Sequence, residues 1–252
     1  MRAPLSALAV LIVLLAIWQA VSTLTGLPHY ILPSPAQTFA AGLAQHEFLL
    51  DNALVTLSEM ALGFLAGSLA GILAALAMAA AAPVRAVLHP ALIASQAIPV
   101  FALAPLFVLW MGYGLAPKIA IAALVIFFPV AIAFADGLRR TPPALTDAAR
   151  VMAGPGFTAR LRILRRIAIP AALPSLATGL RLGAGVAAIA AVIGEWAGSS
   201  SGLGYLMLWA NSRSQVPLMF AALIALFVLA VAFSAIIDLL SRRLTPWLKE
   251  TP

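Results

Sequence analysis

Long stretches without a charged side chain are the feature that most constrains the fold of this 252-residue chain. Charge is absent between Met60 and Ala82, between Ile119 and Ala135, and between Leu182 and Gly194. Hydrophobic residues make up 63% of the chain, whereas soluble domains contain about 45–50%. A helix needs about 20 mostly apolar residues to cross a bilayer. These stretches therefore predict an integral membrane protein.

Six apolar segments meet or approach the length of a membrane-spanning helix. They are Leu5–Leu24, Met60–Ala82, Val87–Met111, Pro117–Ala135, Ala168–Ile193 and Leu218–Leu240. No strand-like alternation of apolar and polar residues runs along the chain, which disfavours a β-barrel. We therefore predict an all-α, polytopic membrane protein with six transmembrane helices.

The positions of lysine and arginine predict the orientation. With six spans, twelve of the fifteen basic residues fall on the side of both termini, and seven of the twelve lie between residues 137 and 167. Lys118 and Arg213 fall on the opposite side, and Arg181 lies within a span. Because cytoplasmic loops are rich in lysine and arginine, we expect both termini and the arginine-rich loop to be cytoplasmic, in a bacterial inner membrane.

This topology predicts three regions. They are an N-terminal transmembrane helix with a periplasmic segment (1–53), a core transmembrane domain (54–241) that contains the cytoplasmic loop 137–167, and a cytoplasmic tail (242–252). The first helix has an alternative interpretation as a signal peptide, because Arg2 precedes its apolar run. No convincing small-x-small cleavage site follows, so we expect the helix to be retained.

Small residues and prolines predict how the helices pack. Gly63, Gly67 and Gly71 recur every four residues, which allows a second backbone to approach closely. Their partner is either a neighbouring helix of the same subunit, which we favour, or a second subunit. Pro99 and Pro105 interrupt the third span and free backbone carbonyls, which is tolerated at membrane depth only against protein or water.

Ionisable residues within spans are costly and are functional candidates by default. Arg181 is expected near the middle of the membrane. It cannot reach Glu195, because fourteen residues of helix separate the two by about 20 Å. Arg181 therefore needs water or a partner on another helix, either in a structural ion pair or lining a pathway. Glu59 and Asp238 are expected at the interfaces.

The cytoplasmic loop contains a short helix with a narrow apolar stripe. Thr141 is predicted to cap this helix, the Gly154-Pro155-Gly156 segment to end it, and Thr158 to cap a second helix that leads into the fifth span. The stripe has the spacing i, i+3, i+4, i+7 and suits docking into a groove. It is formed by Leu145, Ala148, Ala149 and Met152.

The sequence "DAARVMA…IAIPAALPS" resembles the signature loop of binding-protein-dependent ABC importer permeases. Asp147 stands for the usual glutamate, Ala148 and Ala149 match, and Pro170 closes the motif, with four residues more between the acid and the proline than the family pattern has. The resemblance implies a coupling helix that docks on an ATPase. The implied coupling residues are Leu145, Asp147, Ala148, Ala149, Met152, Ala153 and Gly154.

The resemblance extends over nearly the whole chain. Segments such as "TLSEMALGFLAGSLAGI" and "IPVFALAPLFVLWMGYGLAPKI" are similar to the nitrate/sulfonate/taurine branch, and "GEWAGSSSGLGYLMLWANSRSQVPLMFAAL" is most similar to permeases for pyrimidine precursors of thiamine. The implied fold is that of a type I ABC importer permease, and sulfonate, taurine or nitrate is the alternative substrate. The implied partners are an ATPase dimer, an extracytoplasmic binding protein and a second permease copy, in a homodimer. ATP and Mg²⁺ are used by the ATPase, and this chain is expected to bind no cofactor, metal or nucleic acid.

A translocation path is expected to involve the prolines, the intramembrane charge and the outer loop. Aromatic side chains of that loop could stack on a planar pyrimidine, although an interfacial aromatic belt is the alternative interpretation. The candidates are Pro99, Pro105, Arg181, Glu195, Trp196, Tyr205 and Trp209.

Two other classes of function fit the sequence poorly. An enzyme would need convergent catalytic groups, whereas His29, His46 and His89 are scattered and no HExxH or Ser-His pattern is present. A secondary transporter or channel often has inverted repeats or rows of intramembrane acids, which the sequence lacks. A Walker motif is also missing, so a separate subunit must hydrolyse ATP. We therefore predict a transport subunit and not an enzyme.

Overall fold

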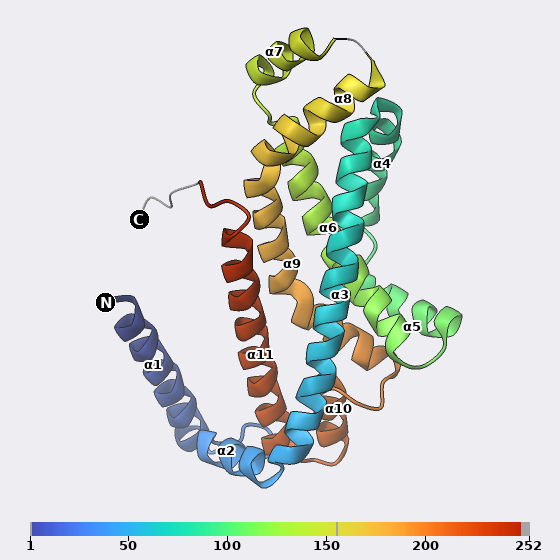
Figure 1. The fold of residues 1–252 in the computed structure, drawn as a ribbon. Helices are drawn as coiled ribbons and strands as arrows, with labels where there is room; N and C mark the ends of the chain where they lie inside the picture. The colour runs from blue at the N-terminus through green and yellow to red at the C-terminus, as the bar shows by residue number, and fades with distance from the viewer. Residues whose placement is uncertain (1, 155, 248–252) are drawn as a thin grey trace. The chain divides into compact units, whose positions relative to one another are not determined.

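The computed structural model describes residues 2–154 and 156–247, without the side chains of residues 2–8, 11, 143, 150, 153 and 157. All regular elements in the described ranges are helices, which confirms the all-α prediction (Figure 1). The helices are α1 (Arg2–Leu24), α2 (Pro35–Ala44), α3 (His46–Ala80), α4 (Ala82–Ser95), α5 (Val100–Met111), α6 (Leu115–Arg139), α7 (Pro143–Ala153), α8 (Phe157–Ile163), the π-helical turn η1 (Leu164–Ala168), α9 (Ile169–Gly198), α10 (Leu203–Ser212) and α11 (Val216–Arg242).

The chain divides into two compact units. The first unit comprises the residues up to Thr56 together with Ser200–Val228, and the second comprises Leu57–Ser199 together with the chain from Leu229 onward. Each unit is thus assembled from segments that are distant in the sequence.

Four continuous helices of the described part are long and apolar enough to cross a membrane: α3, α6, the run Thr158–Gly198 and α11. They correspond to four of the six predicted spans. The first predicted span falls on α1, which has a shorter described apolar stretch over Ile12–Leu24. At 35 residues, α3 is about 52 Å long and exceeds a hydrocarbon core of about 30 Å.

The third predicted span, Val87–Met111, is not one helix. It consists of α4 and α5, which are bent by 104° at a short break. Pro99 is the N-cap of α5 and has an extended conformation. A proline disfavours the α conformation of the residue before it, so the helix is interrupted at Ile98. The sequence had indicated an interruption here but not the size of the bend.

Glycine faces hold the second unit together. A Cβ atom added to Gly67 would lie 2.5 Å from the carbonyl oxygen of Ala123, and one added to Gly71 would lie 2.9 Å from that of Phe127. Both contacts are on α6, and Gly63 meets Ala122 of the same helix. The glycines of α3 therefore face a neighbouring helix of the same chain.

The helix α6 also packs on α9, again through glycines. A Cβ atom added to Gly179 would lie 3.1 Å from the carbonyl oxygen of Pro129, and one added to Gly183 would lie 3.0 Å from Ile126. Buried Ile126, Val130 and Phe134 fill the layer. Because glycine on both flanks lets the backbones approach, α6 is the central helix of this unit.

Polar side chains cap the N-termini of two helices in the first unit. Ser34 and Gln37 form a capping box at the start of α2. On α3, the side chain of Asn52 accepts a hydrogen bond from the Gly202 amide (2.7 Å), and Thr56 accepts one from the Leu203 amide (2.8 Å). These two bonds satisfy otherwise free amides at the N-terminus of α10. The segment that the sequence treats as an outer loop therefore contains a capped helix.

The fifth span begins earlier than predicted. The helix is continuous from Thr158 to Gly198, and its N-cap is Gly156, so the prediction that Thr158 caps it is wrong. The turn η1 precedes Pro170. Proline lacks an amide hydrogen and its ring clashes with the carbonyl four residues before, and a π-helical turn at this point gives the chain one additional residue of room.

Candidate coupling surface and translocation path

The helix α7 lies between the end of α6 and the start of α8, and packs on α8 and η1 (Figure 1). The hydroxyl group of Thr141 donates a hydrogen bond to the carbonyl of Leu138 (3.1 Å). Thr141 therefore closes α6, and the prediction that it caps the following helix is wrong. The physical reason is that a threonine hydroxyl bonds equally well to a carbonyl one turn back.

The predicted apolar stripe of α7 lies on the surface of the chain. Leu145 is 52% exposed and Met152 is 88% exposed. Ala148 is exposed and Ala149 is half-buried, while the side chain of Ala153 lies outside the described residues. Val151, beside the stripe, is 86% exposed. Contiguous apolar groups on a surface typically mark an interaction site, so this face can receive a partner.

Another face of α7 is directed toward the rest of the second unit. Helical periodicity of about 100° per residue places Thr146 and Asp147 away from the stripe, and both line a cavity of about 470 Å³. Asp147 is thus placed apart from Ala148 and Ala149, although the three are consecutive in the motif.

Two glycines make the turn between α7 and α8. Gly154 has φ +72° and Gly156 has φ +123°, conformations that favour glycine. An added Cβ atom would meet nothing within 4 Å at either position, so the requirement is conformational and not steric. Pro155, between the two glycines, lies outside the described residues.

The break between α4 and α5 lies beside a cavity of about 390 Å³ in the second unit. Ser95, Gln96 and Ile98 line it from the break, opposite residues of α6 and α9. Pro99 and Pro105 are exposed, as are large apolar side chains of α5 such as Leu109 and Trp110. Irregular backbone at membrane depth is tolerated where it faces protein or a cavity, and the cavity meets that requirement.

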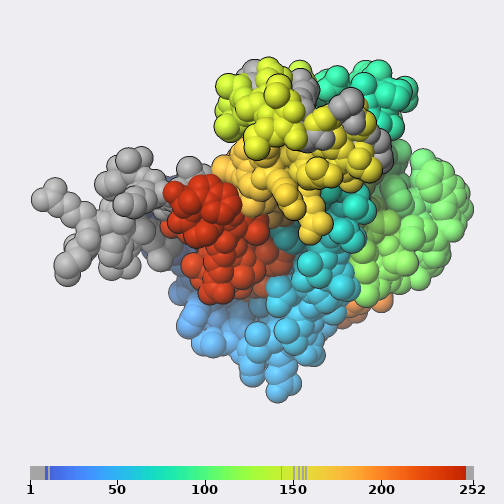
Figure 2. Space-filling model, turned by 45° about the horizontal axis from the view of Figure 1, so that its top comes forward, coloured from blue at the N-terminus to red at the C-terminus, as the bar shows by residue number. Residues whose placement is uncertain are grey.

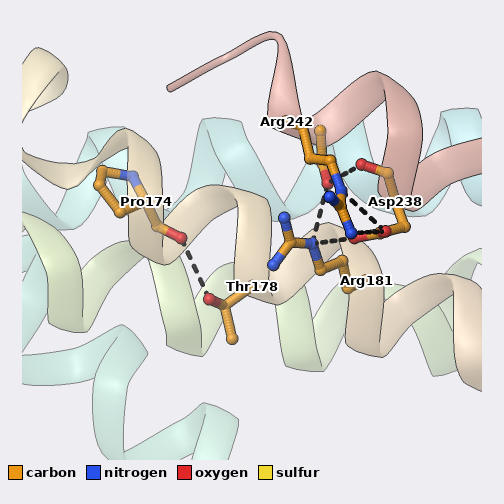
Figure 3. Close-up of polar contacts among 6 residues, drawn as sticks. Pro174, Thr178, Arg181, Asp238 and Arg242 are labelled. Atoms are coloured by element: carbon orange, nitrogen blue, oxygen red, sulfur yellow. Dashed lines mark hydrogen bonds and ion pairs between the residues drawn. The ribbon is translucent and has the colours of Figure 1, made fainter. Parts of the chain in front are cut away.

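Arg181 has its partner on another helix, as expected. Its Nε atom lies 2.7 Å from Oδ1 of Asp238 and donates to the Ser241 hydroxyl oxygen at 3.0 Å (Figure 3). Arg242 also pairs with Asp238, at 2.9 Å. Asp238 lies in the last turns of α11, whereas Arg181 lies near the middle of α9, so its depth in the membrane stays a prediction.

The surroundings of Arg181 keep both of its predicted roles open. Arg181 and Asp238 are partly exposed, and Arg181 lines a cavity of about 450 Å³ with Thr178 and Thr245. Asp238 is held by two guanidinium groups instead of being a lone interfacial residue. The ion pair is present, and whether Arg181 has a structural or a path-lining role stays a prediction.

Glu195 belongs to a buried cluster of charged groups. Lys118 Nζ lies 2.7 Å from Oε1 of Glu59, and Glu195 is a charged neighbour of Glu59. Their exposed fractions are 0% for Glu59, 1% for Glu195 and 6% for Lys118. Glu59 is buried because its carboxylate finds an ammonium partner on an adjacent helix. Its expected position at the level of a membrane interface stays a prediction.

The aromatic candidates are distributed over both units. Trp196, in the second unit, is exposed. Tyr205 and Trp209, in the first unit, are half-buried. The guanidinium carbon of Arg213 lies 4.1 Å from the ring centroid of Trp209, a cation–π arrangement. Phe48 contacts the same tryptophan edge to face, at a centroid distance of 5.3 Å.

Sequence reasoning missed three buried polar residues, Lys118, Asn52 and Thr56. A signal was present on α3, where Asn52, Thr56 and Glu59 follow the spacing i, i+4, i+7 and therefore share one face. A polar line on an otherwise apolar helix indicates polar partners on other elements. No comparable signal marks Lys118, which is a single charge at the start of an apolar run.

The fold and this surface define a class: a multi-pass helical membrane protein with an exposed apolar loop helix between two spans, which is suited to bind a second protein. Residues 67–249 match the family described as "Binding-protein-dependent transport system inner membrane component". The chain belongs to this family. It is the permease subunit of an ABC transporter, a multi-pass inner-membrane component and not an enzyme.

Several relatives cover almost the whole chain. A probable ABC transporter permease protein of Haemophilus influenzae is 50% identical, over 92% of this chain and 93% of its own length. A formylaminopyrimidine transport permease protein of Halalkalibacterium halodurans is 36% identical, over 95% of this chain and 94% of its own length. A riboflavin transport system permease protein of Chloroflexus aurantiacus is 36% identical, over 94% of this chain and 88% of its own length. A taurine transport system permease protein of Escherichia coli is 31% identical, over 94% of this chain and 87% of its own length.

A solved structure supports the fold. The chain of an amino acid ABC transporter crystallised with histidines superimposes with a TM-score of 0.59 at 21% identity, covering 81% of this chain and 98% of that one. At this identity the likeness shows the fold alone, which is that of a type I importer permease.

Proposed function

We propose that this permease works as a homodimer whose α7 helices dock on a cytoplasmic ATPase dimer, so that ATP-driven movement of the ATPase opens the path alternately to the two sides. The observation that carries the proposal is the exposed apolar face of α7, with Leu145 and Met152 at its two ends. An extracytoplasmic binding protein delivers the substrate. ATP and Mg²⁺ are held by the ATPase, and both termini of the permease are cytoplasmic.

The docking proposal is tested by coexpression of the permease with the ATPase encoded beside it. We expect Ala148→Arg with Ala149→Arg to abolish copurification, because two charged side chains cannot enter an apolar groove without a partner. The matched control is Ala82→Arg, at the exposed first residue of α4, which should leave the complex intact. Copurification of the double variant at the wild-type level would refute docking through this face.

For the substrate, we propose a small planar pyrimidine that is a precursor of thiamine. Two relatives at 36% identity are named for formylaminopyrimidine and riboflavin, both planar nitrogen heterocycles. The exposed ring of Trp196 offers a surface on which such a molecule could stack. The alternative is a sulfonate, taurine or nitrate, which the taurine relative supports at 31% identity.

Calorimetry of the cognate binding protein separates the two substrate classes. We expect heat of binding with a hydroxymethylpyrimidine and none with taurine, a sulfonate or nitrate. The reverse pattern would replace the pyrimidine proposal by the alternative. A Trp196→Ala permease should then show slower pyrimidine uptake, whereas unchanged uptake would assign this side chain to an interfacial belt.

A further inference from the structure

A cavity beside α7 is lined by several basic residues. The cavity of about 470 Å³ belongs to the second unit and is lined by the ends of α3 and α6, by α4, by α7 and by the α8–η1 segment. Figure 2 brings this end forward, with α7 and α8 in yellow-green and yellow and the α4 region in teal. The rest of the lining is mostly apolar and comes from α3, α6, α8 and η1.

Basic residues from three different elements line this cavity. Arg85 and His89 come from α4, Arg139 from the end of α6, and Arg160 from α8, whereas Asp147 is the single carboxylate of the lining. Three arginines and one aspartate therefore line the same cavity. Repulsion between these positive charges beside an apolar lining is unfavourable unless an anion offsets it.

The contacts of these arginines within the described part of the chain are weak. Arg139 has Asp136 at 3.9 Å, with both side chains about half exposed. Such a pair contributes little. Arg160 donates to the carbonyl of Ala79, in the last turns of α3, at 3.4 Å. Both guanidinium groups thus keep donors that can turn toward an anion, and guanidinium matches phosphate in bidentate geometry.

The position of the cavity indicates the source of the anion. The cavity lies at the ends of the spans α3 and α6 and beside the start of the long helix that contains α9. In the proposed orientation this is the level of the inner-leaflet headgroups. Basic pockets between helices at that level bind anionic lipid headgroups, and the apolar lining suits the glycerol and upper acyl carbons attached to such a headgroup.

We propose that this cavity is a binding site for a phosphate-bearing anion, supplied by the headgroup of an anionic phospholipid. Thr146 and Asp147 of α7 line the same cavity, so the bound headgroup supports the inner face of the helix whose outer face docks on the ATPase. The proposal rests on the proposed function for its orientation and its effect on coupling. Lipid binding itself is measured on the permease alone.

The test uses the purified full chain in vesicles of phosphatidylcholine with increasing phosphatidylglycerol. We expect Arg85→Gln and Arg160→Gln each to weaken retention of phosphatidylglycerol, measured by native mass spectrometry, by about fivefold or more, since each removes one cation near the headgroup. The matched controls are Arg162→Gln and Arg165→Gln, exposed basic residues of α8 and η1 that do not line the cavity. They should leave retention within about twofold of wild type.

Equal losses in the cavity variants and the controls would overturn the proposal, because general attraction to the membrane surface would then explain the binding. Retention unchanged in all variants would overturn it as well. If Arg160→Gln unfolds, the retention measured for Arg85→Gln, at an exposed position of α4, tests the proposal by itself.

A second experiment adds inorganic phosphate to the permease in vesicles of pure phosphatidylcholine. Saturable phosphate binding that Arg85→Gln weakens would show that the site takes phosphate from a soluble source. No phosphate binding, together with retention of phosphatidylglycerol, would assign the site to the lipid.

These outcomes are distinct from a failure of the proposed function. A permease that retains phosphatidylglycerol but does not bind the ATPase would keep the site and lose the coupling role. Conversely, docking of the ATPase without any selective lipid retention would keep the proposed function and remove this site.

Discussion

Two carboxyl groups and one ammonium group are buried together in the second unit, where α3, α6 and α9 meet. Lys118 Nζ lies 2.7 Å from Oε1 of Glu59, and the Oε2 atom of Glu59 has no hydrogen-bond partner among the described residues. Gly194 lets α9 approach, since an added Cβ atom would lie 3.1 Å from Cα of Lys118. Because a charge leaves water only at a high free energy unless it is paired, this cluster depends on the register of three helices.

The first prediction concerns Lys118. Replacing it by methionine leaves Glu59 buried without its cation, and we expect a loss of about 3–5 kcal/mol in stability. The measurement is the temperature at which the purified permease loses its monodisperse peak. Combining Lys118→Met with Glu59→Gln should recover part of the loss, because the uncompensated carboxylate is removed. A double variant no more stable than Lys118→Met would show that the pair is not the cause.

At the scale of elements, close contact between helices depends on glycine at particular positions. Gly67 faces the backbone of Ala123, and no side chain there can move aside. By contrast, a Cβ atom added to Gly185 of α9 would meet nothing within 4 Å. The four-residue glycine spacing predicts the packing face of α3, but only the structure identifies α6 as its partner.

The second prediction compares these two glycines. We expect Gly67→Ala to destabilise the protein by about 1–3 kcal/mol, because the added methyl group forces α3 away from α6. Gly185→Ala should be neutral or stabilising by up to about 1 kcal/mol, since alanine is the better helix former. Thermal inactivation of purified protein gives both values. Equal effects at the two positions would contradict the close approach at Gly67.

At the scale of the whole molecule, the continuous helix that contains α9 separates the segments that precede and follow it. The part from Ile169 to Gly198 has 30 residues and a length of about 45 Å, more than a hydrocarbon core of about 30 Å. The α7–α8 segment and the segment after α9 should therefore lie on opposite sides. The arginine-rich side is expected to be cytoplasmic.

The third prediction tests this orientation. The chain has no cysteine, so Thr158→Cys and Ser200→Cys, both at exposed positions, can be labelled without background. In intact cells stripped of the outer membrane, an impermeant maleimide should label Ser200→Cys and not Thr158→Cys. Both should react after detergent is added. Labelling of Thr158→Cys in the intact cells would reverse the proposed topology.

Hydropathy, charge asymmetry and the loop motif were sufficient to predict the all-α class, the positions of four continuous spans and the stripe of α7, because each depends only on residues close together in the sequence. The tertiary structure alone decided the 104° bend between α4 and α5, the burial of Glu59 with Lys118, and the convergence of Arg85, Arg139 and Arg160 on one cavity. These features depend on which helices approach one another and in what register. Free energies of transfer can be summed along a chain, but a buried ion pair or a shared cavity exists only once distant segments have packed.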